Sequence, residues 1–178
     1  MNAIVASYAR LTALLEGAWY AIPLRFMVGY GFMEHGYAKL ARGPDSFAII
    51  LHAMGIPEPS LLAALTILVE LIGGFAVLIG AFIPLASIPM AAVLLVAIFT
   101  VHLPYGFSSI KLESVTAAGA HFGQPGYETD LLYLAALCAL VLGGSGPLAI
   151  DRFFIRNHHR TFAESSGRPL EFEDVSAD

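Results

Sequence analysis

The segment at residues 60–101 constrains the fold most, because Glu70 is its only residue charged at neutral pH. As one straight helix it would extend roughly 60 Å at about 1.5 Å per residue, twice the ~30 Å hydrocarbon thickness of a bilayer. The segment must therefore fold back on itself. Residues 80–84 are the expected place, since glycine tolerates a chain reversal and proline is favoured in the first turn of a helix. We expect two membrane spans, at about residues 60–80 and 84–102.

The composition agrees with a membrane protein. The 178-residue chain is 57% hydrophobic and 13% charged, whereas soluble domains have about 25% charged residues. Its formal net charge of -5 gives no reason to expect a nucleic-acid partner. The single cysteine, Cys138, excludes an internal disulfide and a Cys-x-x-Cys redox pair.

Two further apolar runs complete the predicted bundle. Residues 17–40 begin with Trp19 and Tyr20, where an aromatic belt would place them, and residues 129–150 form the other run. We predict an all-α integral membrane four-helix bundle over residues 17–152, because helices satisfy all their backbone hydrogen bonds within lipid.

Segments outside the spans have their own patterns. The spacing of apolar residues at 1–16 predicts an N-terminal amphipathic interfacial helix. A short interfacial helix is expected at 46–54 between spans 1 and 2, with Asp45 as its N-cap and Gly55 as its stop. Residues 105–128 are expected to form a loop, and residues 153–178 a polar cytoplasmic tail.

The basic residues indicate the orientation. Four spans place both chain ends on one side, and that side carries Arg10, Arg152, Arg156, Arg160 and Arg168, against Lys39, Arg42 and Lys111 on the other. The positive-inside rule then places both termini in the cytoplasm.

Arg25 and Glu70 are ionisable residues inside predicted spans. One face of the first span combines cations with small residues, because the residues within about 40° of Arg25 around a helix are Gly29, Phe32, Gly36 and Lys39. The estimated depths of Arg25 and Glu70 differ by only ~5 Å, which predicts that they pair inside the bundle. Such a pair either fixes the helix register or takes part in protonation or ligand binding.

A second set of ionisable residues gathers at the outer side. Its members are Glu34, His35 and Lys39 at the end of span 1, His102 at the end of span 3, and Glu128 with Asp130 at the start of span 4. Two imidazoles and a carboxylate suit either a divalent metal or proton transfer to a quinone. Polar residues also gather at any membrane boundary, and no pair has the i, i+4 spacing typical of a metal site.

Several of these residues occur in an order that resembles the DoxX family of small four-span bacterial inner-membrane proteins. The matching features are Arg25, Phe-Met-Glu-His-Gly-Tyr-Ala-Lys at 32–39, Met-Gly-Ile-Pro at 54–57, Glu70 with Gly73 and Gly74, His102, Gly-Tyr-Glu at 126–128, and Asp151. The resemblance covers about residues 17–152.

The resemblance implies a component of a quinone-linked membrane oxidoreductase system, acting on a sulfur compound or in oxidative stress. It implies catalytic roles for His102, Glu128 and Glu70, and a substrate-binding set of Arg25, His35 and Lys39. The sequence has no haem, flavin or iron–sulfur signature, so a quinone or a membrane redox subunit would carry the electrons. A non-catalytic scaffold or assembly subunit, a homo-oligomer and a small-anion transporter are the alternatives.

Overall fold

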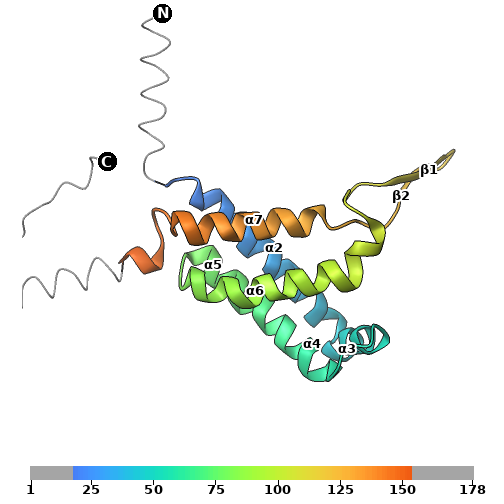
Figure 1. Ribbon diagram of the computed structural model, residues 1–178, viewed down its shortest axis with the longest axis horizontal. Coiled ribbons are helices and arrows are strands. Elements are labelled where there is room, and N and C mark those ends of the chain that lie inside the picture. The colour runs from blue at the N-terminus through green and yellow to red at the C-terminus, as the bar shows by residue number, and fades with distance from the viewer. Residues whose placement is uncertain (1–17, 154–178) are drawn as a thin grey trace, which may run out of the picture.

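The computed structural model describes residues 18–153, so the predicted helix at 1–16 and nearly all of the tail lie outside it. In the described part, the chain forms four helical rods (Figure 1). They are α2 (Ala21–Arg42); α4 (Pro59–Leu68) continued by the π-helical turn η1 (Val69–Gly73) and α5 (Gly74–Ile79); α6 (Ile83–Ala97) continued by the π-helical turn η2 (Ile98–His102) and the 3₁₀ turn η3 (Leu103–Tyr105); and α7 (Glu128–Gly143). The short helix α3 (Pro44–Ala53) and the strands β1 (Leu112–Thr116) and β2 (Gly119–Phe122) lie in the connections.

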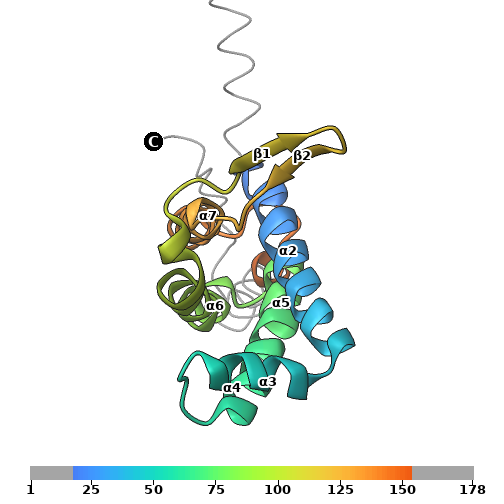
Figure 2. The same ribbon diagram turned by 90° about the vertical axis from the view of Figure 1, so that its right-hand side faces the viewer.

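The four rods surround a common apolar core. Helix α2 packs on α5, η1 and α7, while α6 packs on α7, η1 and α5. Figure 2 looks nearly along α6 and α7 and shows α2 beside α5. The core consists of Ala21, Val28, Phe32, Val77, Ile83, Met90, Leu94, Leu137 and Leu140. A smaller apolar cluster of Ala48, Leu51 and Ala63 joins α3 to α4.

Two of the rods have the length and apolar composition needed to cross a membrane. They are Pro59–Ile79 and Ile83–Tyr105, and only 33% and 28% of their most apolar windows are buried inside the molecule. A core helix of a soluble protein would be mostly buried, whereas here Leu68, Ile72, Phe75, Ile88 and Phe99 are exposed. An outer surface of this kind is suited to lipid contact.

The chain reversal predicted at 80–84 is confirmed. Gly80 has φ +72° and Phe82 φ +51°, both in the left-handed region, and Pro84 lies in the first turn of α6. Asp151 fixes this turn, since its carboxylate accepts a hydrogen bond from the Phe82 N–H at 3.0 Å and its own N–H donates to the Gly80 carbonyl at 3.1 Å.

Other predicted boundaries differ from the structure. Helix α7 ends at Gly143, because Gly144 (φ +82°) and Gly146 (φ +70°) leave the helical conformation, so the run at 129–150 is helical for only part of its length. The helix expected at 46–54 is present as α3, but it begins with Pro44 after Gly43, and Asp45 lies in its first turn rather than at its N-cap. Gly55, with φ +73°, follows its end as expected.

The connection at 105–128 contains a β-hairpin that the sequence did not indicate. Strands β1 and β2 pair antiparallel, with Thr116 opposite Gly119 across the tight turn. Every residue of both strands is exposed, and the hairpin extends away from the helical rods (Figure 1).

Candidate ligand-binding site

Arg25 is buried one turn into α2 and donates hydrogen bonds to five backbone carbonyls. Two of them, Val77 and Leu78, belong to the last turn of α5, where carbonyl groups carry partial negative charge. The other three are Ser145, Pro147 and Leu148, in the segment after α7. The guanidinium therefore ties the end of α5 to the chain after α7. These bonds use all five of its N–H donors, which leaves none for the substrate-binding role predicted for Arg25.

The predicted pairing of Arg25 with Glu70 is wrong, because Glu70 pairs with Lys39. The Lys39 Nζ lies 2.6 Å from Oε1 and 2.7 Å from Oε2 of Glu70. Side chains lean toward the N-terminus of their own helix, and α2 runs antiparallel to the rod that contains Glu70. Arg25 and Glu70 therefore lean in opposite directions. Arg25 reaches carbonyls seven and eight residues beyond Glu70, a rise of about 11 Å.

The two side chains of the Lys39–Glu70 pair differ in their exposure to solvent. The Glu70 side chain is 6% exposed and that of Lys39 is 23% exposed. The ammonium also lies 5.2 Å from the centre of the Phe47 ring, a cation–π arrangement that connects α2 with α3. Gly36 allows the close approach of α2, because a Cβ there would come within 3.0 Å of the Glu70 Cβ.

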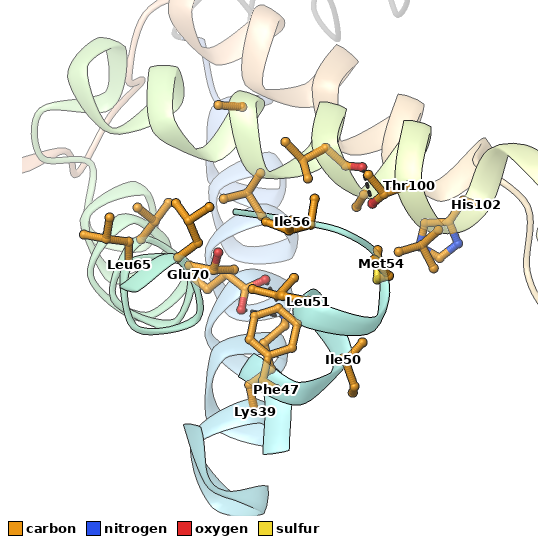
Figure 3. Close-up of a pocket in the computed structure, with 18 residues that line it drawn as sticks. Lys39, Phe47, Ile50, Leu51, Met54, Ile56, Leu65, Glu70, Thr100 and His102 are labelled. Carbon is orange, nitrogen blue, oxygen red and sulfur yellow. Dashed lines mark hydrogen bonds and ion pairs between the residues drawn. The ribbon is translucent and has the colours of Figure 1, made fainter. Parts of the chain in front are cut away.

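Two cavities meet at this ion pair. The first, of about 400 Å³, lies between α3 and α4 on one side and α6 and η2 on the other, and its lining is mostly apolar (Figure 3). The second, of about 260 Å³, lies between α2, α6 and α7, and it includes Pro125, Gly126, Thr129 and Asp130. The shared residues are Lys39, Glu70, Val93, Ala97 and His102. Lys39, Glu70 and His102 thus lie between a mainly apolar cavity and a second cavity that has more ionisable side chains in its lining, among them His35 and Asp130.

His102 is held in one orientation between the two cavities. Its Nδ1 lies 3.1 Å from the Pro125 carbonyl oxygen, and because a carbonyl can only accept, Nδ1 is the donor. In the neutral ring, Nε2 therefore carries no hydrogen and is the nitrogen that accepts a proton. Nε2 lies 3.9 Å from Oδ2 of Asp130, so protonation would place an imidazolium beside a carboxylate.

Part of the chain is similar to a known protein family. The family model named DoxX matches residues 21–103. Residues 21–103 are thus similar to a DoxX domain. This match confirms the resemblance given by the sequence motifs, and DoxX proteins are membrane proteins, in agreement with the two apolar rods. Searches of curated proteins and of solved structures gave no match.

The DoxX domain contains most of the predicted site residues. Lys39, Glu70 and His102 line both cavities, and His35 lines the second one. Glu128, beyond the domain, lines neither cavity. Its carboxylate instead accepts a hydrogen bond from the Ser109 N–H at 2.9 Å and so fixes the connection before α7.

Asp130 lines the second cavity, although the sequence placed it in the outer-side set without giving it a catalytic or substrate-binding role. Residues 128 and 130 differ by about 200° around a helix, so only one of them faces the bundle. Leu137, seven residues after Asp130, is in the core, and this periodicity was the signal in the sequence that favours Asp130. Within residues 18–153, no three His, Cys, Asp or Glu side chains are grouped closely enough to hold a metal ion.

Proposed function

We propose that this DoxX-domain protein is a component of a quinone-linked oxidoreductase system of the bacterial inner membrane, with the quinone bound where the two cavities meet. The observation that carries this proposal is that Lys39, Glu70 and His102 are shared by a mainly apolar cavity and a second cavity that also contains His35 and Asp130. A quinone has the matching chemistry, since an apolar chain is joined to a ring with two carbonyl acceptors.

The residues between the two cavities supply the proton chemistry that quinone reduction needs. A quinone becomes a quinol by taking up two electrons and two protons. The Lys39 ammonium donates a hydrogen bond to one ring carbonyl. Nε2 of His102 delivers one proton, with Asp130 stabilising the imidazolium before the transfer, and the second proton comes from water through the second cavity. The electrons come from a redox subunit or a reduced sulfur compound that docks from the water side.

The proposed topology has four membrane crossings and both termini in the cytoplasm. Its support is the arrangement of the ends of the rods, since the β-hairpin and α3 lie at one end while residues 80–82 and 150–153 lie at the other (Figure 1). Single cysteines at Ala118 and Arg152, introduced in a Cys138→Ser background, test it. A membrane-impermeant thiol reagent should label only the Ala118 variant in intact spheroplasts, and the reverse result would contradict this orientation.

Calorimetric titration of the purified protein with a short-chain ubiquinone tests ligand binding. We expect saturable binding that Glu70→Gln and His102→Ala each weaken about tenfold, the effect of losing one hydrogen bond of ordinary strength. Glu34→Gln and His52→Ala are matched controls, because both residues are exposed and line neither cavity. Equal affinities in all four variants would contradict the proposal.

A scaffold or assembly subunit is the second candidate. The fully exposed hairpin favours it, because the outer edges of β1 and β2 can pair with another strand. Purification in mild detergent should then recover a stoichiometric membrane partner, and deletion of residues 112–122 should release it. Retention of the partner by the deleted chain would argue against this use of the hairpin.

A further inference from the structure

The apolar cavity lies between two rods whose outer surfaces are suited to lipid contact. Its walls come from Pro59–Ile79 and Ile83–Tyr105, the two rods long and apolar enough to span a membrane. Leu65 and Val96 stand on opposite walls, and both are about half exposed. A gap between two such rods opens sideways into the hydrocarbon layer.

The interior of this cavity remains apolar up to the ion pair. Leu51, Ile56, Leu62, Val69, Val93 and Ala97 are among its lining residues. Figure 3 shows Glu70 in the middle of the lining side chains and Lys39 beside Phe47. The Thr100 hydroxyl donates to the Val96 carbonyl of its own rod at 2.7 Å, so its hydrogen is already used. The ionisable residues of this cavity are Lys39, Glu70 and His102, and apart from Thr66 and Thr100 the rest of its lining is apolar.

The inner end is suited to one polar head. The Lys39 ammonium has three donors, while the interactions at this site are with the Glu70 carboxylate and the Phe47 ring. Because its side chain is partly exposed, it can donate to an acceptor that reaches the cavity. The second cavity, which contains His102 and Asp130, is a separate and more polar approach to the same ion pair.

We infer that the apolar cavity binds the single hydrocarbon chain of a membrane-soluble amphiphile, which enters sideways from the bilayer between α4 and α6 and places its polar head at Lys39 and Glu70. The inference rests on the proposed function in taking the head to be a quinone ring. It adds that the chain is a recognised part of the ligand and that entry is from lipid rather than from water.

A substitution that fills the cavity tests the binding of the hydrocarbon chain separately from the binding of the polar head. Val96→Trp places a large ring at the cavity wall, whereas Leu95→Trp places the same ring at the neighbouring position, which is similarly exposed but does not line the cavity. Each protein is titrated in the same detergent with a long-chain ubiquinone and with its tailless ring analogue, and the ratio of the two affinities is compared. We expect the preference for the long-chain ligand to fall about tenfold in Val96→Trp alone.

The other outcomes distinguish the inference from the proposed function. Saturable quinone binding with the same affinity ratio in all three proteins would overturn the inference and leave the proposed function standing. If neither quinone binds, the proposed function fails, and spin-labelled stearate decides the inference. Immobilisation of the label in the parent and Leu95→Trp but not in Val96→Trp supports the chain site, whereas a mobile label in all three overturns it.

Discussion

Replacing Lys39 should destabilise the protein more than replacing Glu70, because Glu70 is buried and Lys39 is partly exposed. Lys39→Met would leave a carboxylate buried without its counter-ion, and we expect this to cost about 3–5 kcal/mol of stability. Glu70→Gln should cost less, since a long lysine side chain can turn its ammonium toward water. Thermal unfolding in detergent measures both.

The double variant Lys39→Met/Glu70→Gln tests whether these losses come from one interaction. It should be more stable than Lys39→Met alone, because it no longer buries an unpaired charge. Simple addition of the two losses would contradict the pairing.

Arg25 stabilises the opposite end of the bundle through its five carbonyl contacts. Arg25→Met keeps a side chain of similar length but removes every donor, and hydrogen bonds to charged groups contribute about 1.5–3 kcal/mol each. We expect a loss of at least about 3 kcal/mol in detergent unfolding, with faster proteolysis at residues 144–150. Arg42→Met, on the exposed end of the same helix, is the control and should change little. Similar losses from both would contradict the role given to Arg25.

At the scale of residues, the sequence predicts which face of a helix is buried better than it predicts partners. Arg25, Gly29, Phe32 and Gly36 were expected on one face of α2, and all four are buried. The partner of Arg25 was predicted wrongly because a helical projection gives direction around the axis but omits the lean of side chains along it.

At the scale of elements, the contact between α2 and α5 depends on two glycines. A Cβ added at Gly29 would lie 2.6 Å from the Gly74 carbonyl oxygen, so Gly29→Ala forces the helices apart. We expect a net loss of about 1–2 kcal/mol, since overpacking costs about 1–3 kcal/mol and the gain in helix propensity returns up to about 1 kcal/mol. Thermal unfolding in detergent measures it, with Ala38→Leu on an exposed face of α2 as the control. A more stable Gly29→Ala protein would show that the two helices can separate at no cost.

Some elements could be predicted from their sequences and others could not. The turn at 80–84 was predictable because Gly80 and Pro84 have narrow conformational preferences. The π-helical turns η1 and η2 were not, since they differ from α-helix by one hydrogen-bond step and have no distinctive composition. They contain Glu70 and His102 respectively, in keeping with the tendency of π-helical turns to occur at functional sites.

At the scale of the whole molecule, one end of the bundle is held by contacts to the backbone and the other contains the cavities. Arg25 and Asp151 fix the end at residues 80–82, while Lys39, Glu70 and His102 lie around the cavities toward the other end. Arg25 and Lys39 are separated by about 21 Å along α2. The apolar runs predicted that four helical rods form, because segment length and hydropathy depend little on side-chain detail. Of the four, Pro59–Ile79 and Ile83–Tyr105 are long and apolar enough to cross a membrane. The cavities could not be predicted, since they arise from the packing of five elements that are distant in sequence.

Photoaffinity labelling of the purified protein with an azido-quinone tests the central claim most directly, because it reports where the ligand lies. The label should be recovered on peptides from α2 near Lys39, from η1 around Glu70 and from α6–η2 before His102, and excess unlabelled quinone should suppress it. Labelling confined to the β-hairpin or to the Arg25 end of the bundle would contradict the site.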